Sequence, residues 1–222
     1  MTSPIRRVVL LHGLWMPGIS MRLLASRLAA AGFAPELFTY PTVAGGPEAA
    51  LPRLIARLSS SPCHVVAHSL GGLVTLTALQ RAPALPVARV VCLGSPLCGS
   101  AAAHGLARRS LTAATLGRSA GLLRQVCEPW QGRPEIGMVA GRVPLGLGQF
   151  FGGIRGDSDG TVAVSETRLV GLREHVVVGA SHSGLLFSAA AARQAIAFLR
   201  HGRFETPSGA ESAEPGNPGQ SG

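Results

Sequence analysis

The chain has no lysine: all 20 of its basic residues are arginine, and with 11 acidic residues they give a formal net charge of +9. The arginines are scattered and form no run longer than two residues. Nucleic-acid binding favours a clustered basic stripe with interleaved aromatic side chains, whereas aromatics make up only 5% of this chain. We therefore expect a solvated basic surface and no nucleic-acid partner, with peripheral contact to an anionic membrane as the weaker alternative.

Long apolar runs are also missing. No stretch reaches the roughly 18 residues that a membrane-spanning helix needs. Near the N-terminus, two arginines precede only four apolar residues at positions 8–11, far fewer than the about 7 to 15 of a secretory signal. We therefore expect a cytoplasmic protein.

Cysteine is scarce, and its spacing gives no metal signature. The four cysteines, Cys63, Cys92, Cys98 and Cys127, form no CxxC pair. This pattern argues against a zinc site, and in a chain this long it does not imply a disulfide framework. Cys63 and Cys92 fall in predicted buried strands, where cysteine acts as a small apolar residue. No metal or cofactor is expected.

The rest of the sequence alternates between two periodicities. Strand-like runs cover residues 7–11, 34–40, 63–67, 89–93, 136–140 and 174–178, and helix-like runs cover residues 19–31, 47–58, 70–81, 101–127 and 183–199. Strands that alternate with helices predict right-handed βαβ units and a mainly parallel sheet. The fold class is therefore α/β.

Length and composition indicate one folded domain. A chain of 222 residues with 46% hydrophobic residues can bury a sizeable core. We assign the domain to residues 1–204 and predict that residues 205–222, rich in Pro, Gly, Ser and Glu, form a disordered tail. Residues 101–135 could form a small helical cap or a plain connecting helix. The glycine-rich segment 142–160 must be a long loop, and such loops tend to be functional or disordered.

The segment "AHSLG", residues 67–71, lies between a predicted strand and a predicted helix. It has the small-x-Ser-x-Gly form of a nucleophile elbow, with Ala67 in place of the usual first glycine. The turn needs small flanking residues, and the helix N-terminus directs partial positive charge and the Leu70 N–H toward Ser69. The alternative is that Ser69 simply caps the helix.

A serine nucleophile needs a base and an acid. Aspartate occurs only at Asp157 and Asp159, within one loop. Asp159 precedes a Gly turn and is the first candidate for the acid, Asp157 is the second and Glu166 the third. The alternative is that Asp159 is a turn residue that binds local backbone amides.

Of the seven histidines, His182 has the position that a base requires. It follows the strand predicted at 174–178 and precedes the last helix, and open α/β sheets place their sites in loops at the carboxyl ends of strands. His68 adjoins Ser69 and is too constrained to act as its base. The alternative for His182 is a capping or exposed loop residue.

The order Ser69, Asp159, His182 resembles that of the α/β-hydrolases, and over residues 5–201 the chain is most similar to compact bacterial lipases and esterases. "HGLW" (12–15) resembles their oxyanion loop, "GSPLCGS" (94–100) their segment after the next strand, and "SDGTV" (158–162) their acid loop. The resemblance implies a three-layer αβα sandwich and the Leu14 N–H as a second oxyanion donor beside that of Leu70. The family's first two strands are missing, which leaves a sheet of about six strands.

The resemblance implies a serine hydrolase that cleaves carboxylic esters, small-molecule or lipid, through an acyl-enzyme on Ser69. Apolar side chains at the catalytic edge would suit an acyl group, and core packing is their alternative role. The candidates for substrate contact are Trp15, Met16, Leu97, Phe150, Phe151 and Leu185. A thioesterase or acyltransferase would use the same three residues, and a non-catalytic binding protein of the same fold stays open as well.

Overall fold

A computed structural model of the chain describes residues 4–14, 16–42, 47–99, 128–145 and 156–206. Several expectations lie outside these residues: substrate contacts of Trp15, Phe150 and Phe151, the helix at 101–127 and the tail after residue 206. The question of a cap over residues 101–135 is therefore left as a prediction.

The centre of the molecule is one parallel sheet. Its six strands run in the order β2-β1-β3-β4-β5-β6, and every neighbouring pair is parallel. The strands are β1 (Arg7–Leu11), β2 (Ala34–Phe38), β3 (Cys63–His68), β4 (Val87–Leu93), β5 (Glu135–Gly141) and β6 (Glu174–Val178). The predicted α/β class and parallel sheet of about six strands are confirmed.

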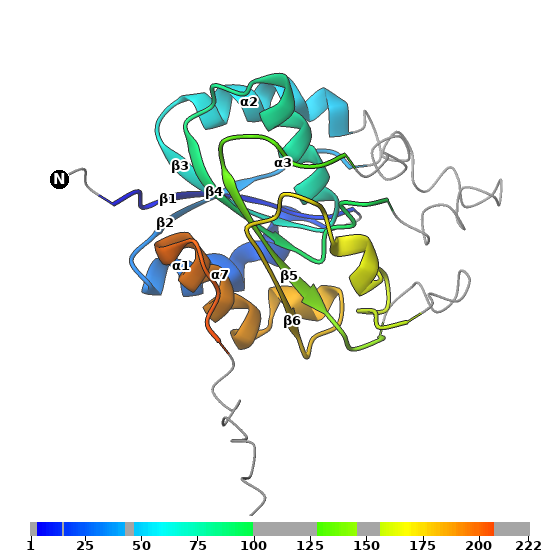
Figure 1. Cartoon of the computed structure of the whole chain (residues 1–222). Helices are drawn as coiled ribbons and strands as arrows, with labels where there is room; N and C mark the ends of the chain where they lie inside the picture. Colours follow the sequence, from blue (N-terminus) through cyan, green and yellow to red (C-terminus); the bar gives the residue numbers. More distant parts are fainter. Residues whose placement is uncertain (1–3, 15, 43–46, 100–127, 146–155, 207–222) are drawn as a thin grey trace, which may run out of the picture.

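Helices cover both faces of the sheet. In Figure 1, α2 and α3 lie on one side of the strands and α1 and α7 on the other, which confirms the three-layer αβα arrangement. The helices are α1 (Arg22–Ala30), α2 (Leu51–Ser59), α3 (Leu70–Arg81) and α7 (Ala189–His201), and the short 3-10 turns are η1 (Gly18–Met21), η2 (Pro47–Ala50), η5 (Val164–Thr167) and η6 (Ser183–Leu186).

The four inner strands, β1, β3, β4 and β5, are buried over most of their length because both faces of the sheet are covered there. Successive side chains of β1 point to opposite faces. Val9 and Leu11 pack into the cluster under α2 and α3, whereas Val8 and Leu10 pack into the cluster under α1 and α7. Each such side chain, once fully buried, contributes about 1.5 to 3 kcal/mol.

The last helix begins later in the chain than its periodicity predicts. The helix predicted over 183–199 is interrupted: η6 ends at Leu186 and α7 begins only at Ala189. Ser188 has an extended backbone, and its hydroxyl accepts a hydrogen bond from the Ala191 N–H at 3.2 Å. A serine N-cap of this kind starts a new helix, so the single continuous helix was wrong.

The described cysteines differ in pairing. Cys63 and Cys92 are buried and free, as their strand positions predict. Cys98 is disulfide-bonded, which sequence spacing did not reveal, and Cys127 lies outside the described residues. Disulfides persist mainly in oxidising compartments, and the cytoplasmic location expected from the sequence stays a prediction.

Membrane-spanning character is missing from the described helices: none combines the length and apolar composition that crossing a bilayer requires.

Candidate active site

Ser69 lies in a sharp turn between β3 and α3. Its backbone angles are φ 54° and ψ −122°, and among the described residues it is the one non-glycine residue with positive φ. Such a conformation costs on the order of 1 to 3 kcal/mol and is kept where the surrounding structure imposes it. Its side chain makes no capping hydrogen bond to α3, so the alternative of a simple helix cap was wrong.

Glycines after Ser69 let α3 approach the sheet. A Cβ on Gly71 would lie 2.9 Å from the carbonyl oxygens of both Leu11 and His12. A Cβ on Gly72 would collide with the Ser95 hydroxyl. The small residue that the elbow pattern requires after Ser69 is therefore explained by contact with the ends of β1 and β4.

His182 connects Ser69 to a carboxylate. Its Nε2 lies 2.9 Å from the Ser69 Oγ, and its Nδ1 lies 2.7 Å from the Oδ2 of Asp159. An ionised carboxylate can only accept, so Nδ1 carries the proton and Nε2 is the acceptor for the Ser69 hydroxyl. His182 is 9% exposed, and the structure brings together the three side chains that the sequence singled out.

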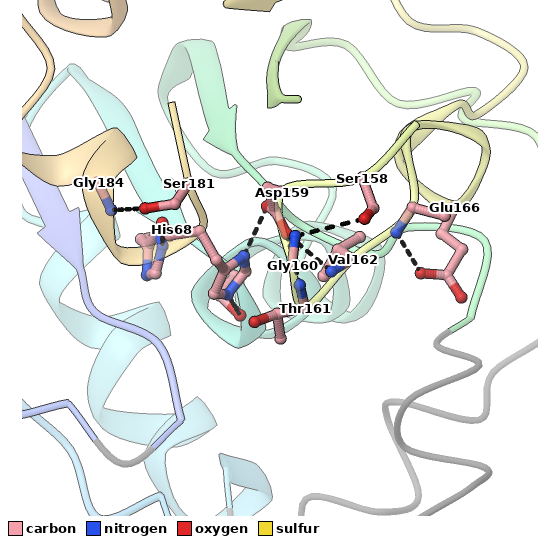
Figure 2. Close-up of polar contacts among 12 residues, drawn as sticks. His68, Ser158, Asp159, Gly160, Thr161, Val162, Glu166, Ser181 and Gly184 are labelled. Carbon is pink, nitrogen blue, oxygen red and sulfur yellow. Dashed lines mark hydrogen bonds and ion pairs between the residues drawn. The ribbon is translucent and has the colours of Figure 1, made fainter. Parts of the chain in front are cut away.

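The acid is oriented by its own loop. Asp159 is 1% exposed, and its Oδ1 accepts the N–H groups of Thr161 at 2.9 Å and Val162 at 2.8 Å. Figure 2 shows this turn around the carboxylate. Asp159 is thus both a turn residue and the partner of His182, because its Oδ1 binds the backbone amides of the turn and its Oδ2 binds the imidazole.

The other two candidate acids lie elsewhere. Asp157 is exposed, and its backbone carbonyl accepts the Val164 N–H. The Glu166 carboxylate accepts the Ala163 N–H at 2.8 Å and so holds the start of η5. Asp159 is therefore the carboxylate that meets His182.

Two glycines at the ends of β4 and β5 make room for the His–Asp pair. Gly94 has φ +56°, and a Cβ there would lie 3.0 Å from the Asp159 Oδ2 and 3.3 Å from the His182 Nδ1. A Cβ on Gly141 would lie 2.8 Å from the Asp159 Cβ. Sequence reasoning missed both residues, although a glycine directly after a predicted strand is a readable signal.

His12 has a structural role at the same edge. Its Nδ1 donates to the Gly13 carbonyl at 3.0 Å, and its Nε2 accepts the Tyr40 N–H at 3.3 Å. The Tyr40 hydroxyl donates to the His12 carbonyl at 2.9 Å, and the two rings are stacked. Burial lowers the pKa of His12, so it fixes the loop as a neutral ring. The sequence did not reveal that Tyr40 helps to hold His12 in place.

The two residues expected to form the oxyanion hole adjoin Ser69. Leu70 is the first residue of α3, where N–H groups lack an acceptor inside the helix. Leu14 follows Gly13, on which a Cβ would lie 2.9 Å from the Ser69 Cβ. Their role as oxyanion donors stays a prediction.

The described candidates for substrate contact have different surroundings. Met16 is half-buried and packs against the cluster under α1 and α7. Leu185 has no exposed surface, and its side chain would be 2.8 Å from a Cβ on Gly94. Leu185 therefore supports the His–Asp pair from within the core, and its assignment to substrate contact is corrected.

Leu97 lines a small cavity beside α3. The cavity has a volume of about 190 Å³, and Leu97 itself is 5% exposed. Its other lining residues are Leu73, Leu76, Thr77, Gln80, Glu128 and Leu169. The lining is thus a mixture of leucines and polar side chains, and substrate contact by Leu97 stays a prediction.

No protein-family model and no curated protein matches the sequence. Solved structures do match. The mature lipase BlEst2 of Bacillus licheniformis superposes with a TM-score of 0.68 at 20% identity, over 83% of this chain and 88% of that one. The chain spans 49% of the propeptide form of the same lipase.

Two further structures agree in fold. The metagenomic carboxyl esterase MGS0156 has a TM-score of 0.61 at 21% identity, over 82% of this chain and 65% of that one. An extracellular α/β-hydrolase of a Paenibacillus species has a TM-score of 0.55 at 15% identity, over 89% and 99%. The chain therefore has the α/β-hydrolase fold, as its motifs predict, and identities this low leave the reaction open.

Proposed function

We propose that the chain is a serine hydrolase that cleaves carboxylic esters through an acyl-enzyme on Ser69. The observation that carries the proposal is the series of hydrogen bonds from Ser69 to His182 and from His182 to Asp159, at 2.9 Å and 2.7 Å. The strained backbone of Ser69 supports it, because such strain is kept where a side chain must be presented at one point.

In the acylation step, the Ser69 Oγ attacks the ester carbonyl carbon while the His182 Nε2 takes its proton. Asp159 accepts from Nδ1 and stabilises the imidazolium that forms. The carbonyl oxygen becomes an oxyanion, which the N–H groups of Leu14 and Leu70 would stabilise by about 3 kcal/mol per donor. The imidazolium then protonates the departing alcohol, and the acyl group stays on Ser69.

Deacylation repeats these steps with water. His182 takes a proton from a water molecule, whose oxygen attacks the acyl carbon. The tetrahedral intermediate collapses, the carboxylic acid leaves, and the proton returns to Ser69. The burial of Asp159 favours this cycle because charge interactions strengthen where water is excluded. The chemistry requires no metal or cofactor.

The test combines a covalent probe with a substrate series. A fluorophosphonate should label wild-type protein and not the Ser69→Ala variant. p-Nitrophenyl esters from acetate to palmitate should be hydrolysed by wild type alone, with the chain-length optimum reporting the acyl pocket. Wild-type protein that neither reacts with the probe nor turns over any ester would refute the proposal and favour a non-catalytic binding protein.

A matched thioester distinguishes the related reactions. For one acyl chain, kcat/KM is measured with the p-nitrophenyl ester and with the acyl thioester, each with water or an added alcohol as acceptor. Faster ester hydrolysis is the expected result. A thioester preference, or transfer of the acyl group to the alcohol, would replace esterase by thioesterase or acyltransferase with the same nucleophile.

A further inference from the structure

His68 is the last residue of β3 and the immediate neighbour of Ser69, yet the proposed reaction does not use it. Its side chain is fully buried. Its Nε2 lies 3.0 Å from the backbone carbonyl oxygen of His182, and the two rings lie 4.8 Å apart between centroids. Figure 2 shows His68 beside the segment that contains Ser181 and Gly184. The buried imidazole of His68 therefore contacts the backbone of His182, the proposed base.

The surroundings of His68 define its protonation. A carbonyl oxygen can only accept, so Nε2 carries the proton. Nδ1 is buried and has no hydrogen-bond partner among the described residues, and a Cβ on Gly13 would lie 2.9 Å from it. A second proton on Nδ1 would be buried without an acceptor, which disfavours the cation.

The surroundings of His68 lower its pKa on balance. Burial is the largest cause, the neighbouring rings of His182 and His12 also lower the pKa, and the hydrogen bond to the His182 carbonyl raises it; together they give a pKa of about 3. Asp159, the carboxylate of the site, is already paired with His182. His68 therefore stays neutral at the pH where His182 must gain and lose a proton.

His182 is held at three points, and one of them is His68. Its Nδ1 donates to the Asp159 side chain, its N–H donates to the Asp159 carbonyl at 2.9 Å, and its own carbonyl accepts from His68. His68 is joined to Ser69 by a peptide bond, so a closed loop of interactions connects the nucleophile and the base. This loop consists of that peptide bond, the hydrogen bond from His68 to the His182 carbonyl and the hydrogen bond between His182 and Ser69.

We propose that His68 is a positioning residue of this site: its neutral ring, protonated at Nε2, holds the His182 carbonyl and thereby sets the distance from the His182 imidazole to the Ser69 hydroxyl. The proposal rests on the function proposed for Ser69 and His182. A neutral ring suits this role, because it adds no second positive charge when His182 becomes an imidazolium during acylation.

Two substitutions separate the hydrogen bond from the packing. His68→Gln keeps an N–H near the position of Nε2, and His68→Met removes the donor at similar volume. The matched control is His64→Gln, since His64 is a buried histidine of the same strand whose Nδ1 also has no partner among the described residues. Rates are divided by the concentration of sites that a fluorophosphonate titrates, which removes unfolded protein from the comparison.

We expect His68→Met to lower kcat by about 10- to 100-fold with little change in KM, because a small displacement of reacting groups has effects of this size. His68→Gln should recover most of the loss, and His64→Gln should match wild type. Wild-type kcat per titrated site in His68→Met would overturn the proposal, as would a His68→Gln variant no better than His68→Met.

Nitrogen-15 NMR of histidine-labelled wild-type protein tests the protonation directly, including the case in which His68→Met does not fold. The His68 ring should carry its proton on Nε2 and should not titrate between pH 5 and pH 8. A proton on Nδ1, or a charged ring in this range, would overturn the proposal. Ester hydrolysis that is absent in wild type would refute the proposed function instead, and the NMR result would not depend on it.

Discussion

The two ends of the sheet carry charge pairs of opposite character. At the amino end, where β4 and β5 begin, Arg89 donates to Glu135 at 2.8 Å and Arg173 approaches the same carboxylate at 3.8 Å. The Glu135 side chain is 38% exposed. At the carboxyl end, His182 and Asp159 pair at 2.7 Å, and the carboxylate is 1% exposed. A carboxylate paired with a basic side chain thus lies partly in water at one end and in the core at the other.

This difference predicts which end of the sheet is more sensitive to substitution. Exposed ion pairs contribute roughly 0 to 1 kcal/mol and tolerate change, whereas a buried charge left without its partner is strongly destabilising. Among the described residues, it is the carboxyl end that combines the buried pair with a strained Ser69 and with glycines that admit no Cβ, such as Gly71 and Gly141. Substitutions should therefore divide by the end of the sheet at which they fall.

The largest effect is expected from the base. His182→Ala removes the acceptor of the Ser69 proton and should lower kcat by about a million-fold, the size found when a nucleophile–base pair is broken. The measurement is p-nitrophenyl butyrate hydrolysis at substrate saturation, with circular dichroism to verify the fold. A folded variant that keeps more than about one hundredth of wild-type kcat would assign the base elsewhere.

The acid should follow by a smaller factor. Asp159→Asn keeps the volume but can no longer hold His182 in the productive tautomer, and a loss of about ten-thousandfold in kcat is expected. Asp157→Asn is the matched control, because it is the chain's other aspartate, lies in the same loop and is exposed. Equal losses in the two variants would contradict the assignment of Asp159.

Much of this site could be predicted because the relevant signals are local. Five consecutive residues, 67–71, identify the elbow. The chain has only two aspartates, so few residues could serve as the catalytic acid. All six described strands appear where the strand-like runs of the sequence place them, with ends shifted by at most two residues. Local patterning is read correctly wherever a strand is covered on both faces.

The remainder depends on contacts between distant segments. Neither the bond from His68 to the His182 carbonyl nor the stacking of Tyr40 on His12 follows from periodicity, since each joins segments that are far apart in sequence. Leu185 was misjudged for the same reason, because its place at the catalytic edge suggests substrate contact, while the side chain in η6 is buried in the core. Tertiary packing decided these cases.

Acid should destabilise the protein through histidines at both ends of the sheet. Burial lowers the pKa values of His64 and His175 to about 4 and that of His68 to about 3, against an ordinary value of 6.5. Between pH 6.5 and about 4 the unfolded chain binds protons that the folded chain refuses, so the free energy of unfolding falls as the pH falls through this window.

The size of the acid effect can be divided between the two ends. Unfolding near pH 5 should take up about two to three protons, read from the slope of the free energy of urea unfolding against pH. His64→Gln and His175→Gln, at the amino ends of β3 and β6, should each remove about one proton from this slope. A slope that is unchanged in both variants would mean that the burial of His64 and His175 does not control the stability of the protein in acid.

Glycine contacts give an effect of intermediate size. Gly71→Ala places a Cβ against two backbone carbonyls that cannot rotate away, and we expect the free energy of unfolding to fall by about 1 to 3 kcal/mol. Gly179→Ala is the control, because a Cβ there would meet no atom within 4 Å. Both are measured by urea unfolding, and similar losses would show that close approach is not the reason for Gly71.

The smallest effect is expected at the amino end, from Glu135→Gln. Arg89 also donates to the carbonyls of Leu199 and Arg200, at 3.0 Å and 3.2 Å, so the last turn of α7 holds its guanidinium without the carboxylate. The free energy of unfolding should therefore change by less than about 1 kcal/mol, with kcat/KM for p-nitrophenyl butyrate unchanged. A larger loss of stability, or any loss of activity in folded protein, would mean that the exposed pair and the buried pair are coupled through β4 and β5, and the contrast between the two ends would no longer hold.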